Sequence, residues 1–155
     1  MHTLIRKISI AFLVLPLLFL ARPSAAQAEE MTCPTPMEVI VDVKPADAVN
    51  QIKLSARGLV PVAVLSTPDF DASLFVPMMA HLHDATEPMD CSGAAAVRWN
   101  YSDVNGDGLV DLVFFFRAQD LTLTPATTAV MLMAHGTYGG EEIHIMGMDA
   151  VIVRK

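Results

Sequence analysis

Short stretches in which hydrophobic and polar residues alternate run through most of the chain. In residues 38–43 the three valines share one side, and in residues 97–101 Val97, Trp99 and Tyr101 do the same. A period of two predicts strands, because successive side chains of a strand point to opposite faces. Further apolar or alternating runs predict strands at 52–54, 59–65, 78–83, 110–117, 129–134, 143–148 and 150–153.

This set of about seven to nine short strands predicts an all-β fold, an antiparallel β-sandwich, with one helical turn around Ala72. Residues 112–116 are apolar on both faces, which is typical of a central strand in two stacked sheets. Residues 136–140 are predicted to form a hairpin loop. The chain has no internal repeat, which argues against a propeller.

Oxygen-bearing side chains recur between the predicted strands at 97–101 and 110–117, in Asp103-Val-Asn105-Gly-Asp107-Gly-Leu109-Val-Asp111. These residues match positions 1, 3, 5, 7 and 9 of a calcium loop, with glycine at position 6 and the Leu109 carbonyl at position 7. Ca²⁺ takes six to eight oxygen ligands, and odd-numbered side chains of a tight loop converge on one point. The sequence therefore predicts one Ca²⁺ held by Asp103, Asn105, Asp107, Leu109 and Asp111.

The loop differs from that of a helix–loop–helix calcium site. Phe114 stands at position 12, where a bidentate Glu belongs, and a strand follows instead of a helix. We therefore expect weak binding, with a dissociation constant of about 10⁻⁴–10⁻³ M, and a further ligand from water, Asp120 or Asp149. The alternative is a plain Asn-Gly or Asp-Gly hairpin turn, which would not require three mutually repelling carboxylates.

The first 28 residues have the features of a secretory signal peptide. Arg6 and Lys7 precede an apolar stretch at 8–20, and Ala26-Gln-Ala28 provides a small-x-small cleavage site. The apolar stretch is shorter than the roughly 20 residues that span a bilayer. The sequence thus predicts a signal peptide at 1–28, an extended arm at 29–37 and a β-domain at 38–155, secreted to the periplasm or the extracellular space.

Charge limits the partners of the mature chain. The predicted signal carries three basic residues and no acid, so residues 29–155 hold seven Lys and Arg against 17 Asp and Glu, a formal charge of −10. Such an acidic chain is unsuited to nucleic acid or to an anionic membrane surface. The two cysteines, Cys33 and Cys91, are predicted to form a disulfide in an oxidising compartment.

Several motifs in a fixed order add a family resemblance. They are Val41-Asp-Val-Lys-Pro45, Ile52-Lys-Leu54, Gly58-Leu-Val-Pro61-Val-Ala-Val-Leu65, Asp69-Phe70-Asp71, Asp103 to Leu112, Thr137-Tyr-Gly-Gly140 and Asp149-Ala-Val151. Across residues 39–153 the chain resembles a domain of bacterial secreted and surface proteins that reads I-D-I-K-P-G, then I-P-V-A-I-L, then D-x-N-G-D-G-x-x-D-L. The resemblance implies a calcium-binding β-domain without a settled activity, often attached to larger proteins. Ala46 in place of Gly, and a Met-rich segment at 144–148, depart from the pattern.

Methionine and histidine alternate near the C-terminus and suggest a different metal. His81 and His83 would share one strand face, as would Met131, Met133 and His135, with His144, Met146 and Met148 across the hairpin. Thioether sulfur suits Cu(I) and imidazole suits Cu(II), so Met131, Met133, His135, His144 and Met146 are the first residues to test for copper. The structural alternative is that these methionines fill gaps in the core and bind no metal.

The sequence contains no Gly-x-Ser-x-Gly elbow, no His-Glu-x-x-His helix and no phosphate-binding glycine loop. We therefore expect a non-catalytic calcium-binding domain that acts as an interaction or accessory module, with a protein or glycan at the cell surface as its partner. A copper-binding protein is the first alternative, and a secreted enzyme of another class is the second.

Overall fold

The structure is a computed structural model that describes residues 35–88 and 93–155. All of them belong to a single unit that spans residues 31–155. The described residues form eleven strands and two 3₁₀ turns: β1 (Met37–Glu38), β2 (Val41–Val43), β3 (Gln51–Lys53), β4 (Leu59–Val64), η1 (Ala72–Leu74), β5 (Phe75–Asp84), β6 (Ala94–Ala95), β7 (Arg98–Ser102), β8 (Asp111–Arg117), η2 (Ala118–Asp120), β9 (Ala129–Tyr138), β10 (Glu141–Ala150) and β11 (Ile152–Arg154).

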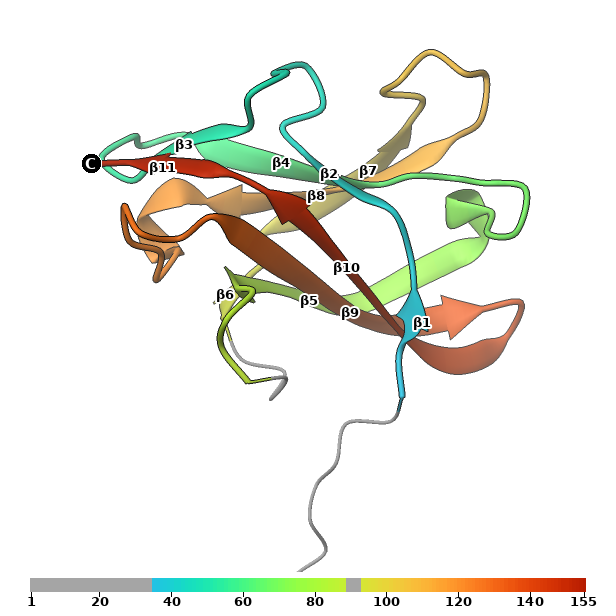
Figure 1. Cartoon of the computed structure of the whole chain (residues 1–155). Helices are drawn as coiled ribbons and strands as arrows, with labels where there is room; N and C mark the ends of the chain where they lie inside the picture. Colours follow the sequence, from blue (N-terminus) through green and yellow to red (C-terminus); the bar gives the residue numbers. More distant parts are fainter. Residues whose placement is uncertain (1–34, 89–92) are drawn as a thin grey trace, which may run out of the picture. The chain divides into compact units, whose positions relative to one another are not determined.

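The strands form two layers, which confirms the predicted all-β sandwich (Figure 1). One layer is a five-stranded sheet in the order β1-β10-β9-β5-β6, and the other is a four-stranded sheet in the order β2-β4-β8-β7. Neighbours within these sheets are antiparallel except β1 and β10, and the separate pair β11 and β3 is also parallel. Both parallel pairs join a segment from the first third of the domain to a segment at its end.

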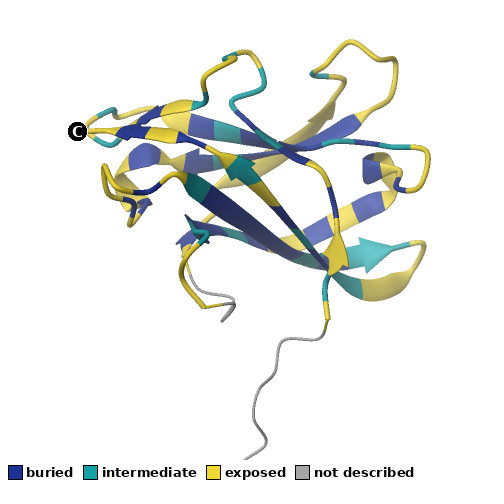
Figure 2. Ribbon diagram, viewed as in Figure 1, coloured by how far each residue is buried: buried dark blue, intermediate teal, exposed yellow. Residues whose placement is uncertain are grey.

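The core lies between the two sheets. Buried and exposed residues alternate along parts of several strands (Figure 2). Leu112, Phe114 and Phe116 on β8 are fully buried, as the predicted central strand requires. Leu82 on β5 and Leu132 on β9 are equally buried in the opposite sheet. Each such side chain contributes about 1.5–3 kcal/mol of apolar burial, so the central strands carry much of the stability.

Two predicted boundaries are wrong. The strand expected at 78–83 is the ten-residue β5, and the loop expected at 136–140 is only the two-residue turn Gly139-Gly140. Both turn glycines have positive φ, +61° and +94°, which is what a two-residue hairpin turn with the twist of its strands requires. Gly136 lies inside β9 and not in the turn. Glycine is needed there because a Cβ would lie 2.3 Å from the Val76 carbonyl oxygen on β5.

The end of β5 is tied to the segment before β9 through Asp84. Its carboxylate accepts hydrogen bonds from the hydroxyl of Thr127 and from the N–H and hydroxyl of Thr86. The Thr127 hydroxyl, and next the Thr86 N–H, hold the pKa of Asp84 below its ordinary value of 3.8. A depressed carboxyl pKa contributes stability that is present above the ordinary value and is lost as the pH falls through the folded-state value.

Asp84→Asn is expected to lower the free energy of unfolding by about 1 kcal/mol at neutral pH, because the Thr127 hydroxyl loses a charged acceptor. The loss should shrink as the pH falls below 3.8, where the wild-type carboxyl also becomes protonated. Urea unfolding of both proteins across this pH range measures the difference. A difference that does not change with pH would show that the charge of Asp84 is not involved.

Three predictions lie outside the described residues: the signal peptide at 1–28, most of the arm at 29–37, and the disulfide between Cys33 and Cys91. Of the arm, Met37 is already part of β1. In the described ranges no helix has the length and apolar character needed to cross a membrane.

Candidate metal sites

The acidic loop, residues 103–111, connects β7 to β8 at one end of the four-stranded sheet. Ser102 and Asp111 are directly opposite one another in the antiparallel pair. Gly106 and Gly108 have φ angles of +79° and +87°, but Asn105 and Asp107 do not have positive φ. A two-residue type I′ turn needs positive φ at both central residues. The loop is therefore not a two-residue type I′ turn but a longer connection between the paired residues Ser102 and Asp111.

Side chains of the acidic loop accept hydrogen bonds from its own backbone. The Asp103 carboxylate accepts the N–H groups of Gly106 at 2.7 Å and Gly108 at 3.0 Å. Asn105 Oδ1 accepts the N–H of Asp107 at 3.0 Å, and Asp107 Oδ1 accepts that of Leu109 at 2.8 Å. Such local bonds are what Asp and Asn offer in turns. They hold the loop in one conformation, while each accepting oxygen keeps a second lone pair.

Asp111 anchors the base of the loop to the rest of the fold. Its side chain is fully buried, with Oδ1 accepting the N–H of Ser66 at 2.8 Å and Oδ2 that of Val104 at 3.0 Å. The Ser66 hydroxyl donates to the Val110 carbonyl and accepts the N–H of Ala72 at the start of η1. The end of the acidic loop is thereby joined to the segment that precedes β5.

The acids of the loop lack basic partners within the part of the chain that the structure describes. Among the described residues, Lys44 forms an ion pair with Asp47, and His135 Nε2 lies 3.7 Å from a Glu142 carboxylate oxygen. Arg98, on the strand that leads into the loop, lies 3.9 Å above the ring of Phe115. Asp42 is a further acid near this end of the sheet. Burial, and then the charges of Asp149 and Asp111, raise the pKa of its carboxyl. This end of the sheet is a region of uncompensated negative charge.

The carboxylates of the loop are not gathered at one point. Among residues 35–88 and 93–155, no three His, Cys, Asp or Glu side chains are grouped so that they could hold a metal ion. The Asp103 and Asp111 carboxylates are turned instead toward backbone N–H groups. In donor chemistry the loop fits Ca²⁺, since it offers three carboxylates, one amide oxygen and the Leu109 carbonyl.

Of the two distant acids considered as further ligands, Asp149 makes hydrogen bonds elsewhere in the fold and Asp120 lies far from the loop. Asp149 Oδ2 accepts the N–H of Val43 and the Asn50 side-chain amide, both at 2.8 Å, and so closes the turn between β2 and β3. Asp120 follows the far end of β8. The length of β8 alone, about 3.3 Å per residue, separates it from the loop by roughly 20 Å. Water is the third source considered for the further calcium ligand.

The second candidate site is a face of the five-stranded sheet. Register places His135 between Met79 and His144, Met133 between His81 and Met146, and Met131 between His83 and Met148. The intervening residues of these strands, such as Leu82, Leu132 and Ile145, belong to the core, so this set points away from it. We call it the His–Met face: Met79, His81, His83, Met131, Met133, His135, His144, Met146 and Met148.

The predicted copper residues Met131, Met133, His135, His144 and Met146 all lie on this face. The rings of His135 and His144 are stacked with centroids 4.5 Å apart, and His135 Nε2 lies 3.7 Å from a Glu142 carboxylate oxygen. Burial, and next the neighbouring His135, lower the pKa of His144, while Glu142 acts in the opposite direction. The neutral form of this imidazole is thereby favoured at neutral pH.

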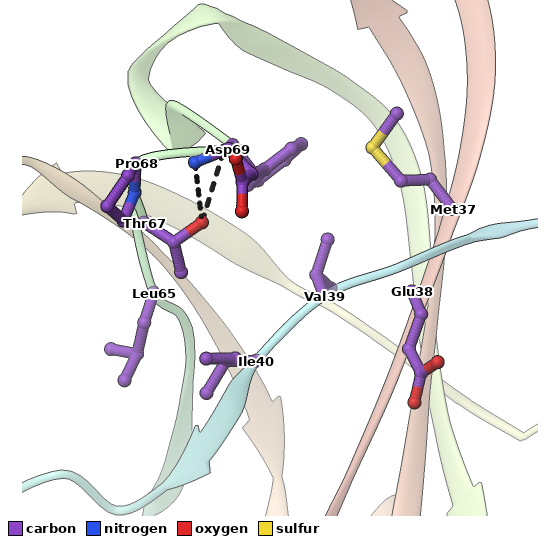
Figure 3. Close-up of a pocket in the computed structure, with 9 residues that line it drawn as sticks. Met37, Glu38, Val39, Ile40, Leu65, Thr67, Pro68 and Asp69 are labelled. Atoms are coloured by element: carbon purple, nitrogen blue, oxygen red, sulfur yellow. Dashed lines mark hydrogen bonds between the residues drawn. The ribbon is translucent and has the colours of Figure 1, made fainter.

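A groove borders the N-terminal strands (Figure 3). Val39 and Ile40 lie on one side and Leu65 and the 67–70 turn on the other, around a volume of about 600 Å³. Glu38 and Asp69 provide its charges, and the Thr67 hydroxyl oxygen accepts the N–H groups of Asp69 and Phe70. The groove therefore has apolar walls and an acidic rim.

Two functional features were missed by sequence reasoning. Met79 lies two residues before His81 on β5 and therefore shares its face, although it was not named as a candidate ligand. The anchoring contact between Asp111 and Ser66 spans 45 residues. Spacing along the chain could have revealed Met79, whereas the contact between Asp111 and Ser66 depends on which segments become neighbours in the fold.

Comparison of the chain with protein-family models, with curated proteins and with solved structures gives no match.

Proposed function

We propose that this protein is a secreted, non-catalytic β-domain whose acidic loop binds one structural Ca²⁺, and that it serves as an interaction or accessory module at the cell envelope or outside the cell. Asp103, Asn105, Asp107 and the Leu109 carbonyl would bind the ion directly. Asp111 stands at the position that often binds through water, which agrees with both of its oxygens accepting backbone N–H groups.

One observation carries this proposal: three carboxylates within nine residues, joined by the negative charge of Asp42, have no basic partner in the described residues. Nearby like charges disfavour their charged forms, and a bound cation offsets that repulsion. A dication would remove this repulsion and join the end of β7 to the start of β8. The groove at Val39 and Asp69 is the surface that such a module would offer to a protein or glycan.

Calorimetric titration of Ca²⁺ into chelator-treated, folded protein tests the proposal. We expect one site per chain with a dissociation constant of about 10⁻⁴–10⁻³ M. Mg²⁺ is the matched control, since it requires an octahedral set and gives up its water reluctantly, so its binding should be weaker. The absence of heat with Ca²⁺, while circular dichroism shows folded protein, would contradict the proposal.

Copper binding, the first alternative, would involve the His–Met face instead of the acidic loop. A secreted enzyme remains the second alternative, and no grouping of side chains described above favours it.

A further inference from the structure

The centre of the His–Met face contains a small hollow. It is lined by Met79, His81, Met133, Ala134, His135 and His144, and its volume is about 30 Å³. A space of that size holds one water molecule or one ion. Met79 and His144 lie directly opposite His135, and His81 lies directly opposite Met133. Directly opposed side chains have Cβ atoms about 4.5–5.5 Å apart, so both members of a pair can reach a single ion.

From this hollow we infer a binding site for monovalent copper, formed by the thioethers of Met79 and Met133 and the imidazoles of the neighbouring pair His135 and His144. The site is separate from the acidic loop, which connects two strands of the other sheet.

The donor set selects the metal. Thioether sulfur is a soft ligand that favours Cu(I), and imidazole also accepts copper. Zinc sites instead draw on Cys, His and carboxylate ligands. The described residues hold no group of three such side chains suited to a metal. A metal that binds here must therefore accept thioether sulfur.

Burial supports a role for Met133 beyond filling space in the core. Its side chain is only 4% exposed although it points away from the core, and it lines the hollow together with His and Met side chains of the flanking strands. The thioether is thus held at the centre of the face, beside imidazoles on both flanking strands. Met79, by contrast, is 52% exposed, so it borders the hollow on the solvent side and leaves an entry path.

A second observation comes from the neighbouring row of the same face. His83 is 2% exposed, and its Nε2 has no hydrogen-bond partner in the structure as described. Its Nδ1 lies 2.9 Å from the Asp84 carbonyl oxygen. An imidazole that donates Nδ1–H to a carbonyl presents a lone pair on Nε2, which is how metal-binding histidines are commonly oriented. Met131 is its directly opposed neighbour, so the pairing of imidazole with thioether continues beyond the hollow.

The test is a competition for Cu(I) against a coloured Cu(I) chelator, without oxygen and with ascorbate to keep the metal reduced. Cys33→Ser/Cys91→Ser protein is measured beside the wild type, because free thiolates would bind Cu(I) themselves. We expect both proteins to remove at least one Cu(I) per chain from the chelator. We also expect Zn²⁺ not to displace it.

Substitutions then locate the metal. Met133→Leu conserves volume, and His144→Gln keeps a polar side chain; each should weaken Cu(I) binding about tenfold or more. Met148→Leu is the matched control, since Met148 is 54% exposed on the same face but does not line the hollow. Asp107→Ala should leave Cu(I) binding unchanged. Melting temperatures without metal verify that each variant is folded.

Two results would overturn the inference. One is failure of the folded Cys33→Ser/Cys91→Ser protein to take Cu(I) from the chelator. The other is an equal loss of Cu(I) affinity in Met133→Leu and Met148→Leu, which would place the metal elsewhere on the chain.

Discussion

Replacement of Asp111 by alanine is expected to lower the free energy of unfolding by about 2–6 kcal/mol in chelator, where no ion contributes. The fully buried carboxylate accepts the N–H groups of Ser66 and Val104. Alanine leaves both donors without an acceptor, and each unsatisfied buried donor costs about 1–3 kcal/mol. Urea unfolding in chelator, followed by the fluorescence of Trp99, the sole tryptophan of the chain, measures the loss.

Asp103→Ala is the matched control for this prediction. It also removes a carboxylate that accepts two N–H groups, but the groups at Gly106 and Gly108 are exposed and water can replace it. Its loss in chelator should stay below about 1 kcal/mol. If the two variants lose the same stability in chelator, Asp111 is not the anchor of the loop.

Asp107→Ala is expected to lower the melting temperature in calcium but hardly at all in chelator. At about 10 mM Ca²⁺, with a dissociation constant of about 10⁻⁴–10⁻³ M, binding adds about 1.4–2.7 kcal/mol to the free energy of unfolding. For a domain of this size that corresponds to about 5–10 °C. Loss of a ligand carboxylate should abolish most of this gain, which thermal unfolding followed by circular dichroism measures.

Two further proteins sharpen this comparison. Asp107→Asn keeps an oxygen that can accept the N–H of Leu109 but removes the charge, so it separates the ion from the local hydrogen bond. Asp120→Ala removes an acid at the far end of β8 and should keep the full calcium-dependent gain. Equal losses for Asp107→Ala in calcium and in chelator would remove the role that we propose for the ion.

The parts of the fold that depend on neighbouring residues could be predicted from the sequence. The apolar run that follows Asp111 identified β8, because a strand buried on both faces needs such a run. The candidate ligands of the acidic loop followed from their spacing alone. The sandwich itself also followed, since many short strands without helices have few other ways to bury their apolar faces.

The parts that depend on strand order could not be predicted. His81 was recognised as sharing a face with His83, but its position opposite Met133 is set by the pairing of β5 with β9. The hairpin boundary failed because Gly136 suggests a turn, whereas here it allows a close approach to the Val76 carbonyl. Local patterns do not distinguish a glycine required by backbone angle from one required by space.

The hydrogen bonds of Ser66 connect the acidic loop to the groove. The residue bonds to Asp111 and Val110 on one side, and it directly precedes the 67–70 turn that forms one wall of the groove. An occupant of the groove that displaced this turn would alter the affinity of the acidic loop for its ion. Thermodynamic reciprocity then requires the ion to change the affinity for that occupant by the same factor. Calcium bound at the proposed site would thereby regulate binding in the groove as well as stabilise the fold.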